Sequence, residues 1–235
     1  SPRKRLWWIR LLMMHRRQCR VVVTWVGCTS PSSSNGYERG PVTERWPGRC
    51  SCRVVLSSGM SIKSYIRTVP DYPKPGILFR DVTGLLENAA GLREAVDAIV
   101  ARYKDQPVDL VAGIEARGFI FGTAVAYALG VGFIPIRKAG KLPGDVIGIN
   151  YELEYGTDRI EVHVGAIQDG NQVLLIDDLI ATGGTAIAAL ELIRRSGGVV
   201  PEACFVIDLP DLGGADRLRA SGCEAHALCA FEAND

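Results

Sequence analysis

The sequence has no run of about 18 consecutive apolar residues, which excludes a membrane-spanning helix of ordinary length. It also lacks the patterns G-x-x-x-x-G-K-[ST] and G-x-G-x-x-G, so a nucleotide hydrolase and a dinucleotide-dependent dehydrogenase are disfavoured. Net charge is nearly absent, because 27 Lys and Arg balance 26 Asp and Glu to give +1. Hydrophobic residues are not scarce: at 47% they are too frequent for a mostly disordered chain. The 235 residues therefore suit one globular domain, with or without an appendage.

The small net charge hides two unlike segments that meet at Met60. Residues 1–59 hold eleven Lys or Arg and two acidic residues, which gives 11 − 2 = +9. The other 16 basic and 24 acidic residues give residues 60–235 a charge of 16 − 24 = −8. We expect residues 1–59 to be a basic N-terminal extension, disordered or not native, and residues 60–235 to be the folded domain.

Three interpretations of the extension are open. It is Arg-rich and has no acidic residue before Glu38, as in a targeting peptide. Its charge also suits an arm that binds nucleic acid. We favour a third interpretation, in which it is upstream sequence absent from the working protein and Met60 is the natural start. A secretory signal is disfavoured, because no long apolar segment ends in a small-residue cleavage site.

The seven cysteines do not predict a metal site. Cys50 and Cys52 are a close pair, but the cysteines before them are poorly spaced for zinc. The other three, Cys204, Cys223 and Cys229, lie among apolar residues, which suits core packing in a reducing compartment. We therefore expect no metal-ligating side chains and a cytoplasmic location.

Residues 60–235 show alternating helix and strand patterns, read from apolar spacing and from Gly and Pro positions. In chain order we expect a helix over 88–103, a strand over 108–114, a helix over 117–129, a strand over 131–136, a long loop over 138–150, a hairpin of 151–155 and 159–164 joined through Gly156, a strand over 172–176, a helix over 183–195 capped by Gly197 and Gly198, a strand over 199–208 and a last strand over 224–230. This alternation predicts an α/β fold with a central parallel sheet covered by helices on both faces. Ligands of such sheets bind beyond the carboxyl ends of the strands.

One segment combines a strand with groups that suit a ribose phosphate. The apolar residues 173–176 lead into Asp177 and Asp178, and a Thr-Gly-Gly-Thr stretch then opens the expected helix. Adjacent carboxylates cost electrostatic energy unless donors such as ribose hydroxyls bind them. Backbone N–H groups at a helix start bind phosphate, and glycines allow its close approach. We predict a 5′-phosphate site at Ala181, Thr182, Gly183, Gly184 and Thr185. A plain capped strand–turn–helix is the alternative.

This segment resembles the signature of the type I phosphoribosyltransferases, which bind phosphoribosyl pyrophosphate (PRPP). Three further segments narrow the resemblance, and they span residues 66–81, 113–119 and 136–156. Together the four resemble the adenine phosphoribosyltransferase family over residues 62–231, whereas residues 1–59 have no counterpart. The resemblance implies the type I phosphoribosyltransferase fold with a flexible β-hairpin flap. It also implies the reaction of adenine with PRPP to give AMP and pyrophosphate.

The resemblance implies roles for individual residues. Leu78 and Arg80 would recognise adenine through their backbones, and Phe79 would stack on the base. Core packing of Phe79 and a surface ion pair of Arg80 with Asp81 are the alternatives. Pyrophosphate would be bound by Glu115, Ala116, Arg117, Gly118, Arg137, Lys138 and Lys141. An unusual peptide geometry is expected between Glu115 and Ala116, and ordinary solvated cations are the alternative for the basic residues.

The hairpin would supply the group that transfers a proton. Glu152 and Glu154 share one strand face, so alternation does not choose between them. The family match Leu153-Glu154-Tyr155-Gly156 selects Glu154 as the catalytic residue and places Tyr155 in the flap. His163 is expected to be a surface or strand residue instead.

The resemblance further implies Mg²⁺, bound mainly through PRPP and pyrophosphate, and a homodimer that binds neither nucleic acid nor membrane. Two other functions stay open. One is a PRPP-sensing regulator that binds nucleic acid, although residues 1–59 lack the periodic helices of a winged-helix reader. The other is an enzyme of the same fold that acts on another base, such as xanthine or orotate.

Overall fold

The computed structural model describes residues 61–153, 156–233 and 235. The expected extension over 1–59 and its boundary at Met60 lie outside these residues and stay predictions. No helix in the described part of the chain is long and apolar enough to cross a membrane.

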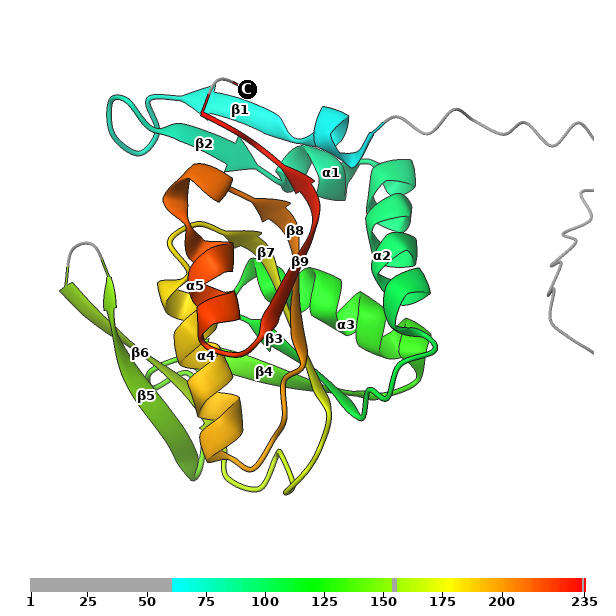
Figure 1. Ribbon diagram of the computed structural model, residues 1–235, viewed down its shortest axis with the longest axis vertical. Coiled ribbons are helices and arrows are strands. Elements are labelled where there is room, and N and C mark those ends of the chain that lie inside the picture. Colours follow the sequence, from blue (N-terminus) through cyan, green and yellow to red (C-terminus); the bar gives the residue numbers. More distant parts are fainter. Residues whose placement is uncertain (1–60, 154–155, 234) are drawn as a thin grey trace, which may run out of the picture. The chain divides into compact units, whose positions relative to one another are not determined.

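A seven-stranded sheet forms the centre of the described domain, in the order β5-β6-β4-β3-β7-β8-β9 (Figure 1). Its parallel strands are β3 (Leu110–Ile114), β4 (Gly132–Lys138), β7 (Val173–Ile180), β8 (Glu202–Asp208) and β9 (Glu224–Ala230). The antiparallel hairpin of β5 (Val146–Leu153) and β6 (Gly156–His163) joins this sheet through pairing of β6 with β4. The expected α/β fold with a central parallel sheet is confirmed.

Helices cover both faces of the sheet, and each face has its own apolar core. One core contains residues of α1 (Thr83–Glu87), α2 (Ala89–Tyr103), α3 (Arg117–Leu129) and the 3-10 turn η1 (Ile62–Tyr65). The other contains residues of α4 (Gly184–Arg195), α5 (Gly214–Ala220) and the hairpin. The 3-10 turn η2 (Pro210–Leu212) precedes α5.

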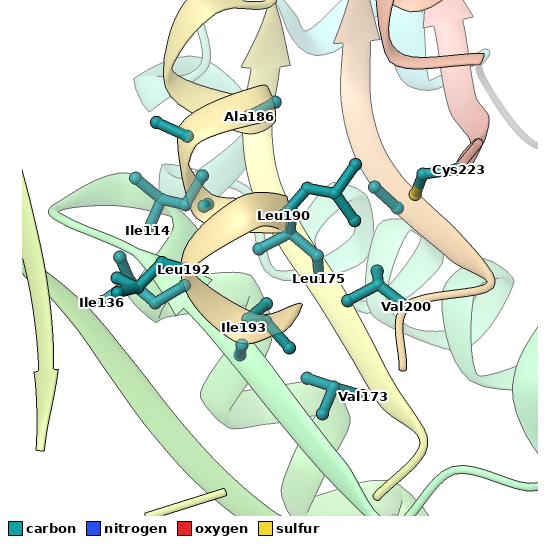
Figure 2. Close-up of a cluster of buried hydrophobic side chains, with 14 of the residues drawn as sticks. Ile114, Ile136, Val173, Leu175, Ala186, Leu190, Leu192, Ile193, Val200 and Cys223 are labelled. Atoms are coloured by element: carbon teal, nitrogen blue, oxygen red, sulfur yellow. The ribbon is translucent and has the colours of Figure 1, made fainter. Parts of the chain in front are cut away.

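The apolar residues of β7 contribute side chains to both cores, because successive side chains of a strand point to opposite faces of the sheet. Val173 and Leu175 belong to the core under α4, whereas Leu174 and Ile176 belong to the core under α3. Figure 2 shows the first of these cores, in which α4 lies over the β7 side chains. Burial on both faces explains why this strand has no alternating polar positions.

A second, two-stranded antiparallel sheet is formed by β1 (Arg67–Pro70) and β2 (Leu78–Asp81). Val69 pairs with Phe79, and Thr68 pairs with Arg80. Figure 1 shows this small sheet at the end of the domain toward which β8 and β9 run. It therefore brings the expected adenine segment to the carboxyl ends of the strands.

Most of the expected elements are confirmed, and helix 117–129 and strand 224–230 have the expected bounds. Helix 88–103 begins one residue later, because the Asn88 side chain caps it by accepting from the backbone N–H groups of Ala90 and Gly91. The loop expected over 138–150 is wrong in its second half, where β5 begins at Val146. The loop prediction depended partly on Gly148. In the structure Gly148 lies inside β5, where the Arg159 guanidinium packs closely against it and leaves no room for a side chain.

Several strand bounds also differ from expectation. The hairpin strands are residues 146–153 and 156–163 rather than 151–155 and 159–164, so Gly156 belongs to β6 and not to the connection. Strand β7 continues to Ile180, so Asp177 and Asp178 lie inside it rather than after it. Strand β8 begins only at Glu202, whereas a strand was expected from residue 199. The sequence patterns did not predict α1, β1, β2 or α5.

Candidate active site

A cavity of about 290 Å³ lies where β3, β4 and β7 end, beside the β5–β6 hairpin and the start of α4. Its charged and polar lining residues are Glu115, Arg117, Lys138, Tyr151, Asp158, Asp177, Asp178 and Thr185. The expected ribose, phosphate and pyrophosphate segments therefore meet at one place, at the carboxyl ends of the parallel strands.

The two adjacent carboxylates of β7 are shielded from water to different degrees. Asp178 is only 4% exposed. The Asp177 carboxyl packs against α3, where a Cβ on Gly118 would lie 2.8 Å from Asp177 Oδ1. Burial and the neighbouring Asp178 charge raise the pKa of Asp177, and burial also raises the pKa of Asp178 against the opposing effect of Arg117. Burial thus disfavours the charged form of the pair, which hydroxyl donors from a ligand would stabilise.

Arg117, the first residue of α3, contacts two parts of the cavity. Its Nε lies 3.1 Å from Asp178 Oδ2. This buried oxygen accepts no hydrogen bond of good geometry from the described residues, so its interaction with Arg117 is ionic. The Arg117 guanidinium carbon also lies 5.7 Å from the centre of the Phe79 ring. The expected ribose carboxylate, pyrophosphate cation and base-stacking ring are thus neighbours.

Glu115 organises the loop after β3 and the end of β4. The Arg137 guanidinium donates to both Glu115 carboxylate oxygens, at 3.2 and 3.0 Å, and the Lys138 N–H donates to Oε2 at 3.0 Å. The hydrogen bond from Arg137 lowers the pKa of Glu115. The Glu115–Ala116 peptide bond is cis, which is the unusual geometry expected there. Arg137 also donates to the Lys141 carbonyl at 2.9 Å, while the Lys141 side chain is exposed and does not line the cavity.

The hairpin lines the cavity with Tyr151, Asp158 and Ile160, and Tyr151 and Asp158 face each other across β5 and β6. Lys138 Nζ lies 3.1 Å from Asp158 Oδ2, and the Tyr151 hydroxyl donates to the same oxygen at 3.3 Å. The hydrogen bond to Asp158 raises the pKa of Lys138. The Arg159 N–H and the Lys138 ammonium lower the pKa of Asp158.

The expected phosphate loop, residues 181–185, runs from the end of β7 into the first turn of α4. Gly183 precedes α4 with a φ of +81°, a left-handed conformation that favours glycine. No side chain caps the first turn, so its backbone N–H groups can donate to an anion. Thr185 lines the cavity directly. The capped strand–turn–helix alternative is not supported.

The expected adenine segment is split between exposed and buried side chains. Leu78 is 40% exposed, and the half-buried Phe79 ring makes an edge contact with Tyr72 at 5.2 Å between centroids. Arg80 is 4% exposed, so the alternative of a surface ion pair with Asp81 is wrong. The Arg80 guanidinium instead donates to the Asp235 carbonyl from two nitrogens, each at 3.1 Å.

The family model described as "Phosphoribosyl transferase domain" matches residues 81–223. The chain is also similar to the adenine phosphoribosyltransferase of Methylobacillus flagellatus, at 64% identity over 173 residues that cover 74% of this chain and 98% of the relative. The chain belongs to the adenine phosphoribosyltransferase family. The type I phosphoribosyltransferase fold is thereby confirmed.

Solved adenine phosphoribosyltransferases have the same architecture. The crystal structure of the Rhodothermus marinus protein matches with a TM-score of 0.68 and 46% identity, over 72% of this chain and 96% of that one. The Trypanosoma brucei protein, solved with AMP, pyrophosphate and ribose-5-phosphate, matches with a TM-score of 0.67 and 30% identity, over 72% and 77%.

Some expected site residues of this adenine phosphoribosyltransferase family member are not placed. Glu154 and Tyr155 lie outside the described residues, so their roles stay predictions. His163 is a strand residue, as expected, and its Nε2 lies 2.9 Å from the Pro143 carbonyl oxygen. Among the described residues, no group of three or more His, Cys, Asp or Glu side chains could hold a metal ion.

Sequence reasoning missed Tyr151 and Asp158 as cavity residues. The available signal was the hairpin register. Joining the strands through Gly156 sets Tyr151 opposite the wrong partner, whereas the observed pairing of Leu153 with Gly156 sets it opposite Asp158. A register with Leu153 opposite Gly156 would have placed Tyr151 opposite Asp158, with both side chains on one face.

Proposed function

We propose that this chain is an adenine phosphoribosyltransferase, which transfers the 5-phosphoribosyl group from PRPP to adenine and releases AMP and pyrophosphate. The bond between C1′ of the ribose and the pyrophosphate oxygen breaks, and a bond between C1′ and a purine nitrogen forms. Such a reaction would serve purine salvage. The observation that carries the proposal is one cavity shared by Asp177, Asp178 and the start of α4.

The ribose 5-phosphate would bind along β7 and α4. The phosphate would accept hydrogen bonds from backbone N–H groups of residues 181–185 and from the Thr182 and Thr185 hydroxyls. The ribose hydroxyls would donate to Asp177 and Asp178. Asp178 Oδ2 supports this role, because it is buried and accepts no hydrogen bond of good geometry within the described chain.

The leaving pyrophosphate would be stabilised by cations around the cavity. Arg117 and Lys138 line it directly, and Arg137 supports it through Glu115. Guanidinium groups suit phosphate oxygens because they stay charged and donate in a fixed fork. Lys141 could reach the pyrophosphate only by movement of its loop, since its side chain is exposed.

Adenine would stack on Phe79 and donate to and accept from the backbones of Leu78 and Arg80. Glu154 would take the proton that the purine ring loses in the forward direction and return it in reverse. The nearness of Arg117 to the Phe79 ring supports this arrangement, because it brings the base segment beside the ribose and pyrophosphate segments.

Mg²⁺ would be held mainly by PRPP and pyrophosphate oxygens, and the two carboxylates of β7 are oxygen donors of the kind that it prefers. When bound, Mg²⁺ neutralises negative charge on the pyrophosphate. The buried Asp178 Oδ2 is ion-paired with Arg117 and accepts no hydrogen bond of good geometry from the described residues, so a metal or a ribose hydroxyl could share it with Arg117.

A homodimer in the cytoplasm completes the proposal. Helix α3 exposes Ile120 at 45% and Tyr127 at 89%, and it carries no charged residue after Arg117. A second copy covering this face would bury both apolar side chains. The free thiols of Cys204, Cys223 and Cys229 suit a reducing compartment. The molar mass in solution tests the dimer.

The function is tested by mixing the protein with Mg²⁺ and PRPP, adding adenine, xanthine or orotate in turn, and measuring pyrophosphate release. Release with adenine alone supports the proposal, and release with another base assigns a different acceptor. No release with any base favours the PRPP-sensing regulator. The Asp178→Asn variant is the control, because loss of its activity shows that the release comes from this chain.

A further inference from the structure

Helix α5 contacts the phosphate loop although none of the roles above involves it. Arg217, on the exposed side of α5, donates from Nη1 to the Thr182 carbonyl at 2.7 Å. Thr182 lies in the middle of the loop that would bind the 5′-phosphate. This bond links two segments separated by 35 residues.

The backbones of the two segments also touch each other. A Cβ on Gly214 would lie 2.2 Å from the Ala181 carbonyl oxygen and 2.7 Å from the Gly183 nitrogen. A Cβ on Gly183 would lie 2.8 Å from the Gly214 carbonyl oxygen. Because side chains at either glycine would force the segments apart, the path of the loop depends on the position of α5.

The hydrogen bond from Arg217 acts on the peptide group that joins Thr182 to Gly183. A cationic donor on the carbonyl of a peptide polarises that peptide and strengthens its N–H as a donor. This N–H belongs to Gly183, inside the expected phosphate cradle. The same bond fixes the orientation of the peptide before a ligand arrives, which reduces the ordering cost of binding.

We propose that Arg217 is a positioning residue for the 5′-phosphate, holding the Thr182–Gly183 peptide in the orientation that binds it. The inference rests on the proposed function, since PRPP and AMP supply that phosphate. Arg217 itself does not touch the ligand. It acts through the backbone of the loop, together with the Gly183–Gly214 contact.

Helix α5 offers a matched control in Arg219. This residue donates to Asp216 Oδ1 at 2.7 Å and to the Ala225 carbonyl at 3.2 Å, so it holds α5 without contacting the loop. Both arginines are exposed, and each donates to a backbone carbonyl outside its helix. A general effect of losing an α5 arginine should therefore appear in both variants.

The experiment compares Arg217→Gln with Arg219→Gln by measuring the dissociation constants of AMP and adenosine, which differ only in the 5′-phosphate. Arg217→Gln should raise the dissociation constant of AMP about five- to tenfold, the loss expected for one charged hydrogen bond. The dissociation constant of adenosine should not change. The KM for PRPP should rise, whereas kcat and the KM for adenine should stay unchanged. Arg217→Lys should restore most of the AMP affinity, since its ammonium can donate to the same carbonyl.

Several results would overturn the proposal. The affinity for AMP could stay unchanged in Arg217→Gln, or the affinities for AMP and adenosine could fall equally. Arg219→Gln could also lower the affinity for AMP as much as Arg217→Gln does. The melting temperatures of the variants separate these outcomes from a folding defect. Turnover of adenine by the unmodified protein tests the proposed function separately, because its absence would be seen without any variant.

Discussion

Arg117 Nε lies 3.1 Å from Asp178 Oδ2, so the cation expected to bind pyrophosphate is paired with a carboxylate expected to bind ribose. The same arrangement occurs twice more around the cavity, where Arg137 pairs with Glu115 and Lys138 pairs with Asp158. Each of these cations is thus held in place by a carboxylate from another element. Each cation keeps further N–H donors beyond its ion pair, so a ligand can add to these pairs without breaking them.

The first prediction concerns Arg117→Gln. Removing this cation takes away a charge that would stabilise the leaving pyrophosphate, so kcat/KM for PRPP should fall about 10²- to 10³-fold. Steady-state kinetics with varied PRPP measure this loss. Arg117→Lys is the control, and it should recover only part of the activity because it lacks the planar fork. Unchanged kinetics in Arg117→Gln would remove Arg117 from the site.

The second prediction concerns stability and pH. The pKa of Asp177 is raised in the folded protein, so the folded state holds this proton more tightly than the unfolded state. The resulting stabilisation is present below the ordinary pKa of 3.8 and is lost as pH rises through the raised value. Asp177→Asn should therefore melt at a higher temperature than the parent protein at pH 7.5, with the difference shrinking toward pH 4.

Thermal unfolding followed by circular dichroism across this pH range checks the second prediction. The variant should bind PRPP more weakly at the same time, since an amide is a poorer acceptor for ribose hydroxyls than a carboxylate. A melting temperature that is equal or lower at pH 7.5 would show that the carboxylate does not destabilise the fold.

The third prediction compares Glu154→Gln with Glu152→Gln. Sequence alternation does not distinguish the two residues, but only Glu154 is expected to exchange a proton with the purine. Glu154→Gln should lower kcat about 10²- to 10⁴-fold, the usual contribution of general acid–base catalysis, and change AMP affinity only a few-fold. Glu152→Gln should retain kcat. The reverse result would transfer the role to Glu152.

The fourth prediction concerns the buried Arg80. Its guanidinium donates to Thr68 Oγ1 and to the Asp235 carbonyl, and it lies 4.5 Å from the centre of the Phe231 ring. Arg80→Leu leaves these acceptors without their donor and should lower the free energy of unfolding by about 2–3 kcal/mol. It should also raise the KM for adenine, because β2 carries Phe79.

Urea unfolding measures the effect of Arg80→Leu, and Arg195→Leu is the control. Arg195 pairs with Glu191 on the surface of α4, where both side chains are about half exposed, so its loss should cost less than about 1 kcal/mol. Equal losses in the two variants would show that the Arg80 contacts contribute no special stability.

The sequence was most informative where one short segment carries both structure and chemistry. The apolar run before Asp177 and the glycines after it are sufficient to predict a strand, a loop and a helix, and the structure contains all three. The carboxyl-end rule then brings Glu115 and Lys138 to the same cavity without any knowledge of side-chain contacts.

Sequence patterns failed where a residue acts through a distant partner. The buried Arg80 donates to the Asp235 carbonyl, 155 positions away in the sequence. No local periodicity of the sequence indicates that contact. The part played by Asp158 depends on hairpin register, where a shift of one residue changes which side chains face the cavity. Helix α5 is short and glycine-rich at its start, so its pattern resembles a loop until it is packed against residues 181–183.

The bond between Arg80 and the Asp235 carbonyl also constrains the order of assembly during synthesis. The ribosome makes β2 long before residues 232–235, and domains fold largely as units while the chain emerges. The strand that would hold the base can therefore complete this contact only after Asp235 has left the exit tunnel. A nascent chain stalled before residue 232 would carry the phosphate loop but not a finished base-binding strand.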